Sequence, residues 1–132
     1  DPPEMAPESP VIHHSVRAAH PRRVTRDLLS GRITVDFPRW CYDHEFPDIG
    51  IRQASEGHAR YQITDGNPLS AVMETAYRVV QSRADGVFTH DSRSRMTCDE
   101  RSFHFQAETV ILENGHEIAR KEWTEEIPRD HL

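Results

Sequence analysis

Apolar and polar residues alternate along nearly the whole second half of this chain, from residue 71 to residue 132. Between residues 103 and 111, every second position is apolar or small: Phe103, Phe105, Ala107, Thr109 and Ile111. A period of two is typical of a β-strand with one face against a core and one face in water. The pair Asn114-Gly115 follows, and it favours a hairpin turn because both residues tolerate positive φ. The pattern therefore predicts long antiparallel strands.

Similar patterns extend the prediction toward the N-terminus. Residues 22–29 and 33–37 alternate on either side of Ser30-Gly31, which predicts a hairpin, and residues 11–19 form a weaker candidate for an edge strand. The segment 38–50 holds two prolines and a glycine and is expected to be a long, aromatic-rich loop. Strands are expected over 49–55 and 59–64, with a turn at Gly57 between them, and a short turn is expected over 69–71.

Four longer strands are expected after residue 71, with turns at Asp85-Gly86, at residues 98–101 and at Asn114-Gly115. The total is about eight strands and no helix beyond a single turn. This spacing of turn signals is typical of an all-β antiparallel β-sandwich or barrel.

Length and composition agree with one β-domain. The chain has 132 residues, a hydrophobic fraction of 36% and a mean hydropathy of -0.74. We expect residues 1–20, which include four prolines in the first ten positions, to form a Pro-rich linker or edge segment, and residues 21–132 to form the β-domain. The low hydrophobic fraction also indicates a loop, a tail or a surface that needs covering.

Charge argues against one class of partner. The chain carries 16 basic and 22 acidic residues, a formal net charge of -6. A general nucleic-acid binder needs a basic stripe against the phosphates, so nucleic acid is not an expected partner. The local basic run Arg17, Arg22, Arg23 and Arg26 is better explained as an exposed strand edge than as a phosphate site.

Nothing in the sequence indicates a membrane span or a secretory signal, and the first residues read as a point inside a longer chain. The two cysteines, Cys41 and Cys98, have no CxxC spacing. They are best interpreted as two idle thiols in a reducing cytoplasm, with a disulfide between them as the less favoured alternative.

No motif for catalysis, a metal or a cofactor is present. The nine histidines form no HExxH pattern, although His90 and His104 lie on strands that could pair. No Gly-x-Ser-x-Gly elbow or glycine-rich phosphate loop occurs, and Cys41 with His44 is a weak candidate for a nucleophile and base. The many carboxylates are expected on the wet faces of strands. We therefore expect no catalytic residue, no metal ligand and no cofactor.

Four aromatic residues are the remaining functional signal: Trp40, Tyr42, Phe46 and Trp123. They could be part of a core, contact another domain, or form a ligand platform on which a sugar stacks. The sequence leaves these three interpretations open.

Three segments suggest a family: residues 61–71 (YQITDGNPLSA), 94–105 (SRMTCDERSFHF) and 123–130 (WTEEIPRD). They resemble the C-terminal region of cocaine-esterase-like hydrolases, which are grouped with the Xaa-Pro dipeptidyl peptidases of the S15 type. The resemblance covers residues 22–132.

The resemblance implies a jelly-roll β-domain, similar to galactose-binding folds, that packs against an α/β-hydrolase domain. The family's catalytic Ser, Asp and His lie in that hydrolase domain, and no position here matches them. The expected role is a non-catalytic accessory domain of a serine hydrolase that shapes the active-site entrance or supports contacts in a homo-oligomer. A free-standing module that binds a carbohydrate or another small ligand is the alternative.

Overall fold

The computed structural model describes residues 10–15, 21–37 and 40–130. These residues form nine strands and one short 3-10 turn, η1 (Pro47–Ile49). The strands are β1 (Ile12–Ser15), β2 (Arg23–Arg26), β3 (Arg32–Asp36), β4 (Trp40–Phe46), β5 (Ile51–Thr64), β6 (Asn67–Arg83), β7 (Gly86–Cys98), β8 (Ser102–Glu113) and β9 (His116–Pro128).

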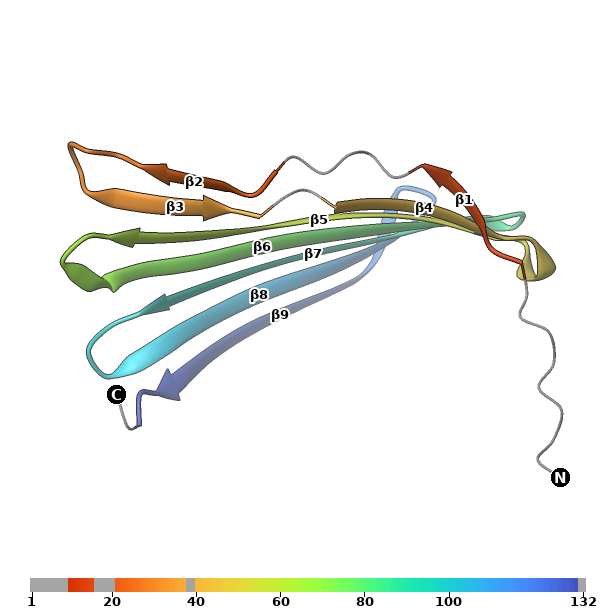
Figure 1. Ribbon diagram of the computed structural model, residues 1–132. Helices are drawn as coiled ribbons and strands as arrows, with labels where there is room; N and C mark the ends of the chain where they lie inside the picture. Colours follow the sequence, from red (N-terminus) through yellow and green to blue (C-terminus); the bar gives the residue numbers. More distant parts are fainter. Residues whose placement is uncertain (1–9, 16–20, 38–39, 131–132) are drawn as a thin grey trace, which may run out of the picture.

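All nine strands belong to one open, curved antiparallel sheet (Figure 1). The order across the sheet is β1-β4-β5-β6-β7-β8-β9, and every pairing is antiparallel. Strand β4 pairs with residues 51–57 of β5, and strand β3 pairs with residues 60–64 of the same strand. Strand β2 pairs with the other side of β3. The β3 and β4 strands thus lie one after the other along a single edge of β5 (Figure 1).

The prediction of an all-β antiparallel fold is confirmed. Because the described strands form a single sheet, the structure does not show a second layer that would make a sandwich or jelly roll. The hairpin around Ser30-Gly31 is confirmed as β2 and β3, and the expected turns before β7 and between β8 and β9 are confirmed as well. The Pro-rich residues 1–9 lie outside the described residues.

The expected loop over residues 38–50 was wrong, because Trp40–Phe46 is strand β4 and η1 follows it. Alternation is present there, with Tyr42, His44 and Phe46 on one side and charged residues between them. The two flanking prolines hid this pattern, although neither interrupts the seven residues of the strand.

Two expected breaks were also wrong. Strand β5 runs without interruption from Ile51 to Thr64, and Gly57 lies inside it, opposite Trp40 on one neighbour and Tyr77 on the other. The expected turn at residues 69–71 is part of β6, whose second residue is a proline at the strand start, where no ladder donor is needed.

Turn chemistry holds the long strands in register. Asn114 and Gly115 both have positive φ, 50° and 82°, as a two-residue turn of this kind requires. The Asn114 side chain also accepts a hydrogen bond of 2.9 Å from the backbone N–H of Val87 in the neighbouring strand. A slip of one residue would exchange the two faces of the sheet, so these turns decide which side chains lie on which face.

The sheet encloses no hydrophobic core of its own. Among the described residues, no hydrophobic side chain is buried. All extensive contacts between elements join strands that are neighbours in the sheet. A single-layer sheet of this length therefore leaves both faces open, and the chemistry of the two faces can be read separately.

Candidate functional site: an uncovered apolar sheet face

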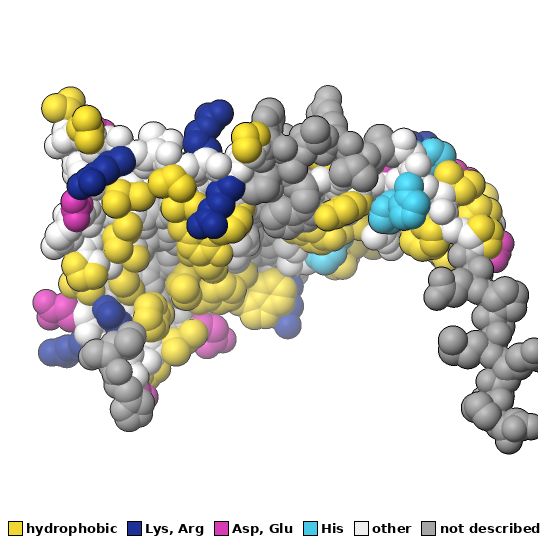
Figure 2. Space-filling view, in the orientation of Figure 1, with side chains coloured by type: hydrophobic (Ala, Val, Ile, Leu, Met, Phe, Trp, Pro, Cys, Tyr) yellow, Lys and Arg dark blue, Asp and Glu magenta, His cyan; other side chains and the backbone are white. Residues whose placement is uncertain are grey.

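One face of the sheet is apolar, and we call it the apolar face. The register of the strands places its large side chains on a common side. They are Val35, Tyr42, Phe46, Tyr61, Ile63, Met73, Val79, Phe88, Met96, Phe103, Phe105, Ile111 and Ile127. Figure 2 shows hydrophobic side chains gathered over the side of the sheet that is turned to the viewer.

The apolar face has a shallow hollow near the β5–β6 turn. Its volume is about 270 Å³, and its lining is almost wholly apolar. The lining includes Ile33, Val35, Tyr61, Met73, Met96 and Phe103. A soluble monomer seldom leaves so many large apolar side chains in water on one face, so this feature is typical of an interaction surface.

The polar side chains in the middle of the apolar face are satisfied by one another. Thr75 and Ser94 share a hydrogen bond of 2.7 Å, and Ser92 and Thr109 share one of 2.8 Å. Near one end of the face, the Gln81 amide donates to Gln53 over 2.9 Å. Burying a polar group is costly only when the group loses its hydrogen-bond partners. A second layer could therefore cover these hydroxyl and amide groups without supplying hydrogen-bond partners of its own.

The opposite face is charged, and we call it the charged face. Opposite charges meet across successive strands in the row Asp36, Arg60, Glu74 and Arg95. The Arg60 Nε lies 2.7 Å from Asp36, and the Arg95 Nε lies 3.8 Å from Glu74. The Asp36 carboxylate raises the pKa of the Arg60 guanidinium.

The same alternation recurs elsewhere on the charged face. Arg78 lies 3.7 Å from Asp91, and Arg120 pairs with Glu108. Arg52 donates two hydrogen bonds to Asp43 and thereby lowers the pKa of that carboxyl group. This face is a network of hydrated ion pairs and needs no cover.

The β2–β3 hairpin presents two exposed leucines at its tip. Leu28 is 87% exposed and Leu29 is 101% exposed. Two hydrogen bonds hold the conformation of the tip: the Asp27 carboxylate accepts one from the backbone N–H of Leu29 and one from the Ser30 hydroxyl. These bonds also lower the pKa of the Asp27 carboxyl group, the Ser30 hydroxyl most of all. A preformed apolar tip beside an apolar face is typical of an interface anchor.

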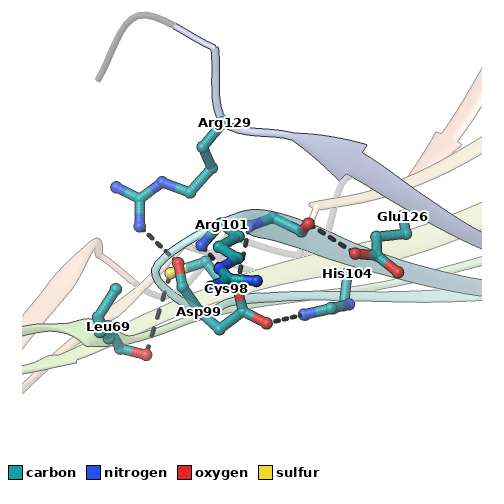
Figure 3. Close-up of polar contacts among 8 residues, drawn as sticks. Leu69, Cys98, Asp99, Arg101, His104, Glu126 and Arg129 are labelled. Atoms are coloured by element: carbon teal, nitrogen blue, oxygen red, sulfur yellow. Dashed lines mark hydrogen bonds and ion pairs between the residues drawn. The ribbon is translucent and has the colours of Figure 1, made fainter.

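A polar cluster lies at the β7–β8 turn, at the same end of the sheet as the β2–β3 tip (Figures 1 and 3). The Asp99 carboxylate accepts hydrogen bonds from the backbone N–H groups of Arg101 (2.7 Å) and Ser102 (2.8 Å). The His104 Nε2 lies 2.8 Å from the other carboxylate oxygen. Together these contacts lower the pKa of Asp99 to about 2, with the Arg101 N–H as the largest cause.

The cluster also fastens the end of β9. The Arg129 guanidinium donates to the carbonyl oxygen of Asp99 over 2.7 Å and lies 5.2 Å from the Phe103 ring (Figure 3). The Ser102 hydroxyl donates to Glu126 over 2.7 Å rather than to His104. A serine nucleophile needs a base that accepts its proton and is itself oriented by a third group, and that chain of contacts is not formed here. The cluster is therefore a structural clamp.

The four aromatic residues singled out in the sequence do not meet. Trp40, Tyr42 and Phe46 belong to β4, and Trp123 belongs to β9, with four strands between them. The register places all four positions on the same side of the sheet as the apolar face. At about 4.8 Å per strand, the Trp123 position is too far from the three β4 positions to share one small ligand with them.

The weak catalytic and metal candidates also separate. Cys41 and His44 lie on opposite faces of β4, and His90 and His104 lie on opposite faces of the sheet. Both cysteines are free. Among residues 10–15, 21–37 and 40–130, no three His, Cys, Asp or Glu side chains gather in a way that could hold a metal ion.

Sequence reasoning left a surface that needs covering as one of three readings of the composition, and it missed the leucine tip and the Asp99 clamp. An aspartate at a turn often accepts hydrogen bonds from the backbone N–H groups two and three residues later, so Asp99 before Arg101 and Ser102 was a signal for the clamp. The lack of a covering layer had no local signal, because alternation predicts one apolar face and is silent about what lies against it.

Comparisons with protein-family models, with curated proteins and with solved structures found no match. Within the described part of the chain, no helix has the length and hydrophobicity that crossing a membrane requires.

Proposed function

We propose that this chain is a non-catalytic accessory β-domain that lies with its apolar face on another protein layer. The observation that carries the proposal is the apolar face, whose large side chains the described residues leave without cover on both sides of a band of paired hydroxyl groups. The partner that we propose is the α/β-hydrolase part of the same parent protein, a serine hydrolase of the esterase or Xaa-Pro peptidase type.

Three features support a protein layer as the occupant. The face spans most of the sheet, which suits a protein surface better than a small molecule. Its central hydroxyl groups and the Gln53 and Gln81 amides near one end are already paired, so cover by an apolar layer is inexpensive. The Leu28-Leu29 tip extends the apolar surface beyond the sheet and would fill a pocket on the partner.

The proposal also accounts for the missing half of the expected sandwich. A second sheet or a helical layer from the parent protein would complete a two-layer domain around the apolar face. The resemblance of residues 22–132 to the C-terminal region of cocaine-esterase-like hydrolases supports the identity of that parent. In such an arrangement the domain would form one wall of the active-site entrance.

The test begins with the reading frame that encodes residue 1 of this chain. The proposal predicts that the upstream frame encodes a hydrolase part with a Gly-x-Ser-x-Gly elbow. That part and the 132-residue chain would be produced separately, mixed and separated by size-exclusion chromatography. We expect the two to elute together, with ester hydrolysis only in fractions that contain the hydrolase part. An upstream frame without a hydrolase, or two parts that elute separately, would contradict the proposal.

A small-ligand module remains the second candidate because of the hollow lined by Met73, Met96 and Phe103. Its lining has almost no polar group, which fits an acyl chain and not a sugar, since a sugar needs hydrogen-bond partners. Titration with a medium-chain fatty acid, followed by tryptophan fluorescence, tests it. Saturable binding at micromolar concentrations would favour this second function over the first.

A further inference from the structure

Strand β9 forms one edge of the sheet, and its outer side pairs with no strand that the structure describes. Its pairing with β8 is regular from residue 119 to residue 128, with a bulge just before that stretch. Of these residues, 119–127 extend about 30 Å and present unpaired backbone N–H and C=O groups, whereas Pro128 has no N–H to donate. An edge of this length invites pairing with another strand.

The charges along the regular part of β9 are divided by sign. Arg120 and Lys121 lie toward its start, Glu125 and Glu126 lie toward its end, and Glu122 lies between them next to Trp123. Two copies of such a strand that pair antiparallel about Trp123 bring the two basic residues of each against Glu125 and Glu126 of the other. Trp123 lies midway between Lys121 and Glu125, on the same side as the apolar face.

We propose that β9 pairs antiparallel with β9 of a second copy of this chain, about a two-fold axis at Trp123. In this register Lys121 faces Glu125 of the second copy on the apolar face. Arg120 faces Glu126 of the second copy on the charged face. Ala119 faces Ile127 of the second copy, and the two Trp123 side chains meet at the axis. Cross-strand pairs of opposite charge stabilise an antiparallel ladder, and aromatic pairs do so as well.

Neighbouring registers bring like charges together. An axis at Lys121 sets two lysines face to face, and an axis at Glu122 sets two glutamates face to face. An axis at Thr124 sets Glu122 against Glu126 of the second copy. Among axes at residues 121–125, the one at Trp123 avoids every directly opposed pair of like charge, so the sequence of β9 selects a single register.

Lys121 and Glu125 have a further reason to pair in this way. Both lie on the apolar face, and within the described residues neither has an ion pair. The Lys121 ammonium group lies 4.9 Å from the centre of the Trp123 ring, so it is held at the edge where the second copy would dock. Self-pairing supplies each of these two charges with its missing partner.

The two-fold axis runs perpendicular to the sheet, so both apolar faces lie on the same side of the dimer. The result is one continuous sheet with twice the apolar surface. This geometry is compatible with the accessory role proposed above but does not depend on it, because the edge and the face are separate surfaces.

Charge reversal tests both the pairing and its register. The measurement is the dimer dissociation constant of the 132-residue chain, obtained by sedimentation equilibrium. Lys121→Glu opposes two carboxylates at each of the two symmetric positions, and Glu125→Lys opposes two ammonium groups. We expect each single variant to raise the dissociation constant at least about tenfold.

The decisive sample is an equimolar mixture of these two single variants. In a heterodimer both symmetric positions regain opposite charges, so we expect the mixture to dimerise about as tightly as the unaltered chain. The matched control is Glu122→Lys, which lies on the same strand but faces Thr124 of the second copy and should leave the dissociation constant within about twofold.

The outcomes are clear-cut. Restoration in the mixture supports the register, whether or not the single variants lose some stability. A chain that stays monomeric at all concentrations overturns the proposal. The proposal is also overturned if the chain dimerises and neither single variant changes the dissociation constant, because the contact would then lie on the apolar face or on another edge. A mixture no tighter than either variant alone also overturns it.

Discussion

The two faces of this sheet follow the same alternation but differ in whether their requirements are met. On the charged face, the row from Asp36 to Arg95 pairs opposite charges in contact with water, and nothing further is needed. On the apolar face, large side chains such as Met96 and Phe105 stay in contact with water, and none of them is buried among the described residues. The comparison shows that the charged face pairs many of its charges within the chain, whereas the described residues leave the apolar face without cover.

The largest expected effect comes from placing a charge on each face in turn. Met96→Asp puts a carboxylate in the centre of the apolar face, whereas Thr97→Asp puts one on the charged face a single residue away. Burial of an unpaired carboxylate under a partner is unfavourable by at least about 3 kcal/mol. In titration calorimetry with the hydrolase part, we expect Met96→Asp to weaken binding about a hundredfold or more. Thr97→Asp should change binding less than threefold, and equal losses would contradict the assignment of the two faces.

A smaller effect is expected from the turn that keeps the faces apart. Gly115 has a φ of 82°, where a residue with a side chain is strained. We expect Gly115→Ala to lower the free energy of unfolding by about 1–2 kcal/mol, measured in urea. An unchanged stability would show that this turn does not hold the register of β8 and β9.

The smallest effect concerns pH and the clamp at Asp99. The folded pKa of Asp99 is about 2, below the ordinary value of 3.8, because backbone N–H groups and His104 stabilise the carboxylate. A carboxyl group with a lowered pKa contributes stability that is fully present above its unfolded value and lost as the pH falls through the folded value. We therefore expect stability to decline from about pH 4 toward pH 2.

Asp99→Asn isolates this contribution. The amide oxygen of asparagine can still accept the two backbone N–H groups, but it carries no charge to titrate. Unfolding followed by circular dichroism from pH 5 to pH 2 should show a shallower decline in the variant. If the stability of both proteins falls equally steeply between pH 5 and pH 2, the clamp does not act through the Asp99 charge.

The sequence predicted the strands well where alternation and turn residues agree. Phe103 to Ile111 and the turn at Asn114-Gly115 led directly to β8 and β9. The same reasoning failed at Gly57, where the pairing of β5 with β6 continues through the glycine. That pairing depends on residues of β6, so the local pattern around Gly57 does not contain it.

The candidate site was predictable only in part. Phe105, Ile111 and the other alternating residues of β8 predicted an apolar face, but its open state depends on the absence of a second layer. The four aromatic residues were recognised as candidates for a core, an interface or a ligand platform. In the sheet, four strands lie between Tyr42 and Trp123. The division of charge along β9 was visible in the sequence, but it gained meaning only when β9 was found at an edge.

The most direct test of the central claim is urea unfolding of the Met96→Asp variant in the 132-residue chain alone. If the apolar face is a surface for another layer, this variant loses less than about 1 kcal/mol relative to the unaltered chain, because position 96 stays in contact with water. A loss of about 3–5 kcal/mol, the value typical of a disrupted core, would contradict the account and show that the chain covers this face by itself.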